Sequence, residues 1–347
     1  MSNLADQPIA MLGAGSWGTA LAHSLAVFGG HEVRLWARRP ELVETVRRER
    51  RNLEYLPNAV LPERVVVTSD IDQAVDGCAL VVVATPSQSV RAVAGSVAGA
   101  LGAEHAVVSV AKGIEIGTLL TTTGVLREVL PAADPDRIGV LYGPSHAEEV
   151  GAGKPTTVVV AMPDDAVAHG AQQAFMTDRL RVYVNADLVG VEIAGSVKNV
   201  MALAAGMADG VGLGDNAKAA LVTRGLAEIK RLGLALGADP LTFAGLAGLG
   251  DLIVTCFSRH SRNRYFGEQI GRGRSLGDVE HEMRMVAEGV KTTNSAKALA
   301  ERHGVEMPIT EAVYDILFNH LRPEDAVYEL MTRAAKREDA LAEVGKG

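Results

Sequence analysis

The sequence is short of several residue types, and each shortage excludes a class of protein. Its two cysteines, Cys78 and Cys256, lie far apart in 347 residues, and no cysteines or histidines have metal-ligand spacing, so we expect neither disulfides nor a metal site. Aromatic residues make up only 4%, which disfavours an aromatic binding platform. There is no uninterrupted run of about 18 apolar residues, and the opening MSNLADQP lacks the basic and apolar parts of a signal peptide. We therefore expect a cytoplasmic protein without membrane insertion.

Basic residues are fewer than acidic residues. The chain has 34 Lys and Arg against 42 Asp and Glu, for a formal net charge of -8, which is opposite to the charge of proteins that grip a polyphosphate backbone. We expect no nucleic-acid partner. Hydrophobic residues (48%) and glycines (37) are abundant, which predicts a globular protein with closely packed helices. The length favours two domains.

The two halves of the chain differ in their hydrophobic pattern. In residues 1–187, apolar runs rich in β-branched residues alternate with helix-like stretches, which predicts an α/β Rossmann-type doubly wound, mostly parallel sheet. From residue 188 to 347 the apolar residues recur every three or four positions, which predicts an all-α C-terminal domain. The expected strands cover residues 9–12, 33–36, 65–67, 80–84, 106–110, 138–142 and 157–160, with 181–184 as a candidate last strand.

A glycine-rich segment, GAGSWG, follows the apolar stretch PIAML and precedes the helix-like TALAHSLAVFGG. In this segment Gly13 permits a tight turn, Gly15 lets the backbone approach a pyrophosphate, and Gly18 lets the helix pack closely on the strand. Amides at the helix start would face the anion. This context predicts a dinucleotide-binding loop; the alternative is a glycine-rich turn without a ligand.

The adenine ribose of a bound NAD is usually recognised by an acidic residue about 20 positions further on. At the end of the second expected strand this sequence has Arg38 and Arg39 instead. Two guanidiniums suit the 2′-phosphate of NADPH by charge and by bidentate geometry, so we expect NADPH to be preferred over NADH. Both arginines are also compatible with solvated positions ahead of the helix that Pro40 begins, and use of both cofactors stays open.

Two more loops are expected at the same edge of the sheet. Lys112 follows the fifth strand and is a candidate active-site cation, because the apolar strand before it directs it towards the crevice; the alternative is a solvated turn. After the sixth strand, residues 143–147 (GPSHA) offer the hydroxyl of Ser145 and amides at a helix start. This segment is equally compatible with ligand binding and with a helix capped by Ser145.

In the helical half, Lys198 lies in EIAGSVKN among small and apolar neighbours. Removal from water would lower the pKa of this lysine towards the working pH and make it a competent general acid. The alternative is a lysine that extends from a buried helix to reach water. Further on, two glycines precede Asp251 in GLGDL, and SRHSRNR (residues 258–264) combines three arginines with two serines and an asparagine. Forked guanidiniums with helix-start donors suit a phosphate dianion; the alternative is a basic surface loop.

Together these motifs resemble one family, bacterial NAD(P)H-dependent glycerol-3-phosphate dehydrogenase, from about residue 8 to about residue 335. The resemblance implies reversible reduction of dihydroxyacetone phosphate to sn-glycerol 3-phosphate, which supplies the glycerophosphate backbone for phospholipid synthesis. The segments that carry it, in the family's order, are GAGSWGTALA, SVAKGIE, GPSHAEEV, SVKNVMALAAG, DNAKAALVTRGLAEI, GLGDLIVTC, SRNRYFG and AEGVKTT.

The same resemblance implies roles for individual residues. Lys198 would be the catalytic proton donor and acceptor, within a substrate-binding set of Lys112, Gly143, Ser145, Lys198, Asp251, Ser261, Arg262 and Asn263. Besides the glycines and Arg39, the cofactor would be contacted by Ser16, Trp17, Arg38, Lys112, Ala147, Arg262, Val286 and Glu288.

Two other functions share part of this pattern. Another Rossmann dehydrogenase with C-terminal helices, such as a 3-hydroxyacid or ketopantoate reductase, has the same layout, but its substrate lacks the phosphate that Arg262 would bind. A non-catalytic NADP-binding regulator would have no use for Lys198 beside the site. The apolar helical domain also makes a homodimer a reasonable expectation.

Overall fold

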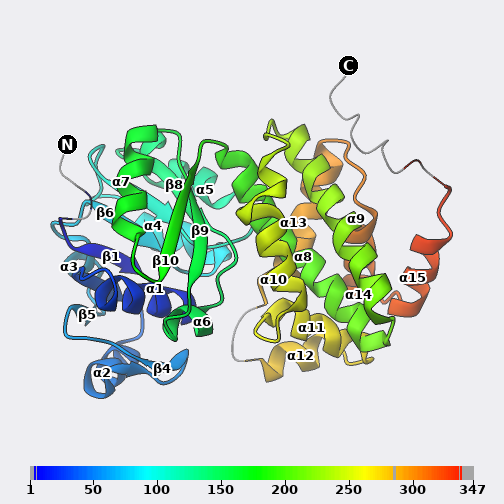
Figure 1. The fold of residues 1–347 in the computed structure, drawn as a ribbon, viewed down its shortest axis with the longest axis horizontal. Helices are drawn as coiled ribbons and strands as arrows, with labels where there is room; N and C mark the ends of the chain where they lie inside the picture. Colours follow the sequence, from blue (N-terminus) through cyan, green and yellow to red (C-terminus); the bar gives the residue numbers. More distant parts are fainter. Residues whose placement is uncertain (1–3, 5, 284–286, 336, 338–347) are drawn as a thin grey trace. The chain divides into compact units, whose positions relative to one another are not determined.

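The structure is a computed structural model of the chain and describes residues 4, 6–283, 287–335 and 337 (Figure 1). Contacts divide the chain into two compact units: Met1–Ala111 with Thr122–Leu188, and Lys112–Thr121 with Val189–Gly347. The sequence places a boundary after residue 187 and assigns Lys112–Thr121 to the first half, whereas in the structure this segment packs with the helical unit. Hydrogen bonds explain that placement, because Ser196 donates to the Gly113 carbonyl (3.3 Å) and Thr121 to Glu192 (2.9 Å).

The first unit is built on an eight-stranded sheet in the order β10-β9-β8-β7-β6-β1-β2-β5. Neighbouring strands are parallel except for β8 and β9, so β9 and β10 run opposite to the other six. The expected Rossmann-type, mostly parallel sheet is confirmed, and the candidate strand at 181–184 is the edge strand β10. The strands are β1 Ile9–Leu12, β2 Val33–Trp36, β5 Val65–Thr68, β6 Leu80–Val83, β7 Ala106–Ser109, β8 Ile138–Tyr142, β9 Thr156–Ala161 and β10 Leu180–Asn185.

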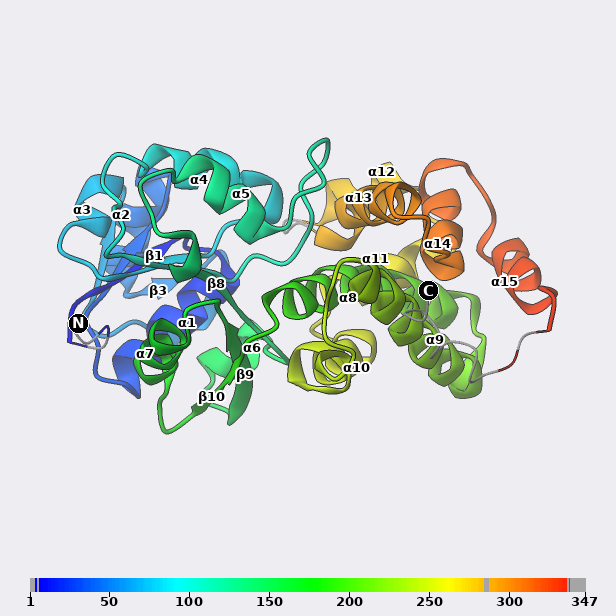
Figure 2. The same ribbon diagram turned by 90° about the horizontal axis from the view of Figure 1, so that it is seen from above.

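Helices cover both faces of this sheet, with α1 and α7 on one face and α3, α4 and α5 on the other (Figure 2). Pro40 occupies the first turn of α2, and the side chain of Asp70 accepts hydrogen bonds from the first amides of α3, as their sequence positions indicate. The helices are α1 Ser16–Val27, α2 Pro40–Glu49, α3 Ile71–Val75, α4 Val90–Ser96, α5 Thr122–Val129, α6 Ala147–Gly151 and α7 Asp165–Phe175, with short turns η1 Ser87–Ser89 and η2 Pro135–Arg137.

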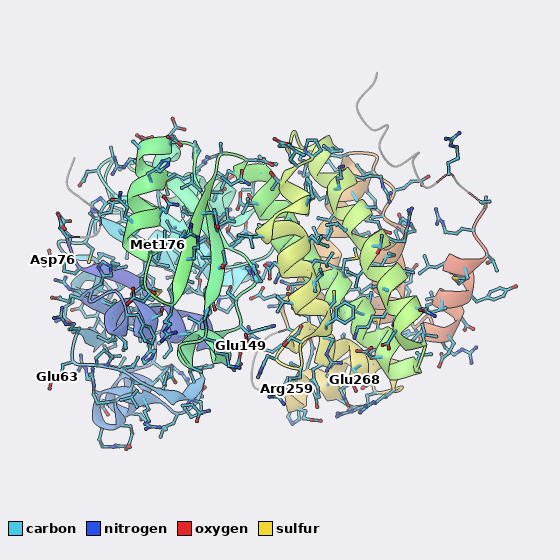
Figure 3. The ribbon with its side chains drawn as sticks, in the orientation of Figure 1. Glu63, Asp76, Glu149, Met176, Arg259 and Glu268 are labelled. Carbon is cyan, nitrogen blue, oxygen red and sulfur yellow. The ribbon has the colours of Figure 1, made fainter. Side chains whose placement is uncertain are left out.

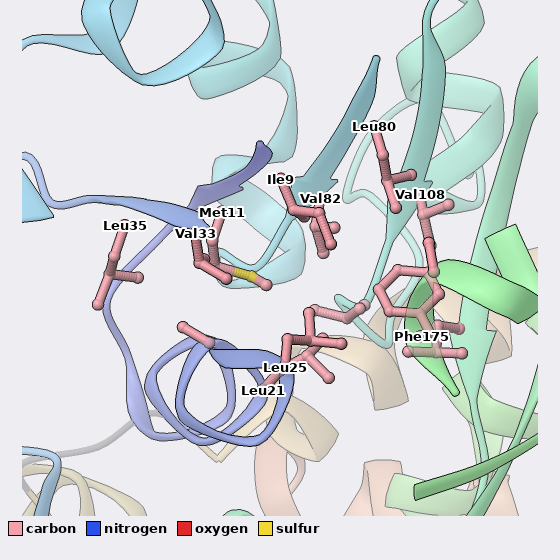
Figure 4. Close-up of a cluster of buried hydrophobic side chains, with 14 of the residues drawn as sticks. Ile9, Met11, Leu21, Leu25, Val33, Leu35, Leu80, Val82, Val108 and Phe175 are labelled. Carbon is pink, nitrogen blue, oxygen red and sulfur yellow. The ribbon is translucent and has the colours of Figure 1, made fainter. Parts of the chain in front are cut away.

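The core of the first unit lies between the sheet and these helices. Leu21 and Leu25 of α1 and Phe175 of α7 meet apolar side chains of β1, β2, β6 and β7, all of them buried (Figure 4). Because β1 and β6 are apolar at every position, the glycine loop that follows β1 extends from a rigid, fully buried strand.

A two-stranded antiparallel hairpin, β3 Arg51–Asn52 with β4 Leu56–Val60, also belongs to the first unit and is absent from the sequence prediction. Its Leu56 and Ala59 pack on Ala20 of α1 and Ala147 of α6. The hairpin therefore lies against the helix that follows the glycine loop.

The second unit is helical, as expected, and among its described residues an isolated bridge between Ile114 and Thr121 is the sole β pairing. The long helix α8 runs through the middle of the other helices (Figure 1). The helices are α8 Leu188–Val211, α9 Gly214–Ala235, α10 Asp251–Phe257, α11 Arg262–Gly271, α12 Leu276–Glu282, α13 Glu288–Arg302, α14 Pro308–Phe318 and α15 Pro323–Met331, with short turns η3 Thr242–Ala244 and η4 Leu246–Gly250.

Helix α8 is long and apolar enough to cross a membrane by length and composition alone, with a mean hydropathy of 1.4. However, 94% of its apolar window is buried within the protein. It carries the buried side chains of Glu192 and Lys198. Helix α8 is therefore the core helix of this unit.

Glycines bring α8 and α11 into main-chain contact. A Cβ atom on Gly206 or Gly210 of α8 would overlap the carbonyl oxygen of Arg264 or Glu268 in α11. Likewise, a Cβ atom on Gly267 or Gly271 of α11 would overlap the carbonyl oxygens of Leu203 and Met207 in α8. The helix that carries Lys198 and the helix that begins at Arg262 are thus packed as closely as two backbones allow.

Candidate functional site

The glycine loop after β1 is shaped by two close approaches. Gly13 has φ +130°, and a Cβ atom there would lie 2.5 Å from the Ala84 carbonyl oxygen at the end of β6. A Cβ atom on Gly18 would overlap the Gly13 carbonyl oxygen. Both positions therefore require glycine, which lets α1 start tightly against β1.

Gly15 differs from these two, because a Cβ atom there would meet nothing within 4 Å. Gly15 is also the N-cap of α1, and no side chain caps that helix. The space beside Gly15 is thus open, and a pyrophosphate that approaches the start of α1 would need such space. The loop lies beside β1, which pairs with β2 on one side and β6 on the other, where the crossovers reverse direction and ligands of such sheets bind. These features fit a dinucleotide.

Asn52 of the hairpin also supports the glycine loop. Its side-chain amide is fully buried and donates hydrogen bonds to the Ala14 carbonyl (2.8 Å) and to the Thr19 hydroxyl (2.9 Å). Sequence reasoning missed this residue, because neither its neighbours nor its spacing indicates a partner 38 positions away.

Arg38 and Arg39 follow β2 and are both exposed. A carboxylate distant in the sequence binds Arg39: its guanidinium donates to Glu54 at 2.6 Å and to the Tyr55 hydroxyl at 3.4 Å. Glu54 and Tyr55 lie in the turn of the β3–β4 hairpin. The hydrogen bond from Arg39 to Glu54 is the main cause that raises the pKa of Arg39.

The loop after β8 does not use Ser145 as a helix cap. Helix α6 begins at Ala147 with His146 as its N-cap and no side-chain cap bond, while the Ser145 hydroxyl donates to the Gly143 carbonyl (3.0 Å). The alternative reading of Ser145 as a cap is therefore wrong. Gly143 has φ +138°, a conformation that favours glycine, and Ala147 is buried.

The second unit gathers two lysines around one buried carboxylate. Lys112 donates to Oδ2 of Asp251 (2.6 Å), and Lys198 donates to Oδ1 of the same side chain. Lys198 also donates to the Thr255 hydroxyl (2.7 Å), which in turn donates to the Asp251 main-chain carbonyl (2.6 Å). Lys198 is 5% exposed and Asp251 1%. Lys198 therefore does not extend to solvent along its helix.

The charges of this cluster shift the pKa values of its members. Burial lowers the pKa of Lys198 to about 7, with the Asp251 carboxylate opposing that shift and the Lys112 ammonium adding to it. Burial also opposes ionisation of Asp251, yet the two ammonium groups hold its pKa below the usual range. The arrangement is a lysine that can give or take a proton near neutral pH beside a carboxylate that stays ionised.

Thr255 was not singled out from the sequence. It lies four residues after Asp251, so both side chains fall on one face of α10. That spacing was the available signal, although threonine at such a position is common in helices of any function.

Helix α11 begins with the other expected substrate-binding residues. Ser261 caps the helix by accepting a hydrogen bond from the Arg264 amide (3.2 Å), and Arg262 is exposed in the first turn. The side-chain oxygen of buried Asn263 accepts a hydrogen bond from the Gly289 amide at the start of α13 (2.9 Å). Glu288 is the first residue of α13, and Val286 lies outside the described residues.

Arg264 does not belong with a phosphate-binding cluster, contrary to the expectation from SRHSRNR. Its guanidinium donates to Asp209 (2.8 Å) and to Glu268 (2.9 Å), the latter labelled in Figure 3. Asp209 also binds buried Lys218. Through these contacts Arg264 links α8, α9 and α11. Arg259 and Arg262 are the exposed arginines of this segment.

Three comparisons with known proteins agree with each other. The family models for the N-terminus and C-terminus of NAD-dependent glycerol-3-phosphate dehydrogenase match residues 8–168 and 187–328. Two relatives from Salinibacter ruber, both named glycerol-3-phosphate dehydrogenase NAD(P)+, are 60% and 57% identical over 95% and 96% of this chain and cover 96% and 97% of their own length. The crystal structure of a glycerol-3-phosphate dehydrogenase from Coxiella burnetii has a TM-score of 0.90 and 39% identity, covering 94% of this chain and 99% of its own.

Proposed function

The chain belongs to the NAD-dependent glycerol-3-phosphate dehydrogenase family, and we propose on that premise that it reversibly reduces dihydroxyacetone phosphate to sn-glycerol 3-phosphate with NAD(P)H. The observation that carries the proposal is the buried Lys198, whose ammonium is held by Asp251 and Thr255. Ketone reduction needs such a proton donor, and the product would supply the glycerophosphate backbone for phospholipid synthesis.

The first unit, close to residues 1–187 of the expected division, would be the dinucleotide-binding domain. Gly13, Gly15 and Gly18 would let the pyrophosphate approach the start of α1, while Ser16, Trp17 and Ala147 would line the cofactor site. Arg38 and Arg39 would favour NADPH, with NADH also accepted. When bound, the reduced nicotinamide supplies the hydride that reaches the ketone carbon.

The second unit, close to residues 188–347, would bind substrate and carry out proton transfer. Lys198 would protonate the ketone oxygen as negative charge develops there, and Lys112 would add positive charge. Asp251 would hold both ammonium groups in place. The remaining assignments follow the family resemblance: Gly143, Ser145, Ser261, Arg262 and Asn263 for the substrate, and Lys112, Arg262, Val286 and Glu288 for the cofactor.

The experiment that tests the reaction follows the absorbance of reduced nicotinamide in mixtures of purified protein, dihydroxyacetone phosphate, and either NADPH or NADH. We expect oxidation of both cofactors, faster with NADPH. Ketopantoate and 3-oxoacids serve as alternative substrates. Turnover of those acids without turnover of the phosphorylated ketone would replace this function with that of the other reductases, and cofactor binding without any turnover would indicate a regulator.

Arg262 provides a sharper test of the substrate. An exposed guanidinium in the first turn of α11 suits a phosphate dianion, so Arg262→Ala should raise KM for dihydroxyacetone phosphate about tenfold to a hundredfold with a smaller change in kcat. Arg259→Ala is the matched control, because Arg259 is exposed in the same segment and is expected to leave KM nearly unchanged. Equal effects of the two substitutions would mean that the segment attracts the anion only through its general charge.

The same proposal includes a cytoplasmic location and a homodimer, with no nucleic-acid partner. The net charge of -8 and the burial of α8 support the absence of nucleic acid and of membrane insertion. Sedimentation of the purified chain would report the oligomeric state.

A further inference from the structure

The β3–β4 hairpin brings a negative charge to the arginines that follow β2. Glu54 accepts a hydrogen bond from Arg39 at 2.6 Å, and the two side chains are 39% and 48% exposed. The Tyr55 hydroxyl lies 3.4 Å from the same guanidinium, and the Arg39 guanidinium is 6.0 Å from the centre of the Tyr55 ring. Arg38 lies near enough to act on the Tyr55 phenol as well. The carboxylate that hydrogen bonds to Arg39 is that of Glu54, while the Glu41 carboxylate acts on Arg39 more weakly.

The hairpin is firmly attached, so this carboxylate is a fixed part of the surface. Buried Asn52 ties β3 to the glycine loop, and the His23 ring of α1 makes a hydrogen bond with the Val60 carbonyl (2.9 Å). The side chain of Arg50 donates to the Leu61 carbonyl (3.1 Å), just beyond β4. Glu54 therefore keeps its place in the turn between two anchored strands.

We infer that Glu54 is a specificity residue that moderates the preference for NADPH by occupying Arg39. This inference rests on the proposed use of NAD(P)H. The Glu54 carboxylate lowers the local positive charge that the two guanidiniums present to the 2′-phosphate by one, and it competes directly for Arg39. NADH carries a hydroxyl at that position, so its affinity does not depend on the same charge balance.

The test is the affinity of Glu54→Gln for cofactor fragments and whole cofactors, measured without substrate. Adenosine 2′,5′-bisphosphate and 5′-AMP, which differ only by the 2′-phosphate, are titrated by calorimetry, and NADPH and NADH by fluorescence. We expect the variant to bind the bisphosphate and NADPH about three- to tenfold more tightly, with 5′-AMP and NADH within about twofold of the unaltered protein.

Two controls separate a specific effect from a general change in charge. Glu63→Gln removes another exposed carboxylate of the same unit, labelled in Figure 3, and should change neither affinity. In an Arg39→Met background, Glu54→Gln should have little effect, because the carboxylate then has no guanidinium to occupy.

Each remaining outcome counts against the inference. Equal tightening of NADPH and NADH, or the same gain in Glu63→Gln, would overturn it while leaving the dehydrogenase function in place. Failure of the unaltered protein to bind either cofactor would overturn the proposed function and this inference with it.

Discussion

Lys198→Ala is expected to lower kcat for the reduction of dihydroxyacetone phosphate by about a thousandfold, with a smaller change in KM. Neither hydrogen-bond partner of this ammonium can replace it as a proton donor: Thr255 donates its own proton to a carbonyl, and Asp251 is ionised. Single-turnover measurements with pre-bound NADPH would place the loss in the chemical step.

Two further variants show whether the loss reflects proton transfer. Lys198→Arg keeps a positive charge but does not give up its proton near neutral pH, so it should remain severely impaired. Lys218→Met removes the other buried lysine bound to an aspartate, and it should lower the melting temperature while changing kcat by less than about tenfold. Near-normal turnover in Lys198→Ala would refute the assigned mechanism.

Asp251→Asn is expected to move the pH range of activity and to destabilise the helical unit. The carboxylate opposes the effect of burial on Lys198, so its loss should lower the pKa of that lysine well below about 7. At a pH near 7, Lys198 would then be mostly neutral in the variant, whereas a large share of it is still protonated in the unaltered enzyme. Two ammonium groups would also lose their buried partner, at a cost of about 3–5 kcal/mol in the free energy of unfolding.

The pH profiles of kcat/KM provide the measurement. In the unaltered enzyme, ketone reduction needs the ammonium and should decline as pH rises through about 7, whereas oxidation of glycerol 3-phosphate needs the free amine and should increase over the same range. In Asp251→Asn both transitions should move to lower pH. Transitions that stay where they are would show that another group titrates, and the melting temperature distinguishes a shifted profile from partial unfolding.

The sequence was informative where a local pattern determines the structure. Strands such as Leu80–Val83 are buried at every position and are recognisable from consecutive apolar residues. The glycine loop could be predicted because it lies between a strand and a helix, and because Gly13 and Gly18 occupy positions that have no room for a side chain. The burial of Lys198 was predictable from the small and apolar residues around it.

What the sequence did not reveal depends on partners far apart in the chain. The link from Asn52 to Ala14 spans 38 positions, and the Asp251 carboxylate reaches Lys112 across 139. Arg264 and Arg262 look alike in SRNR, and only the acidic side chains around Arg264 distinguish a structural arginine from an exposed one. The contact between Glu54 and Arg39 could not be predicted either, because the strands of the hairpin that carries Glu54 are too short to show the alternation of apolar and polar residues typical of a strand.

The crossing of α8 and α11 at four glycines bears on how such an enzyme can change during evolution. Because the two backbones touch, no smaller residue at the crossing can bring the helices closer, and any larger one must force them apart. The spacing between Lys198 and the start of α11 is therefore a fixed length rather than an adjustable one.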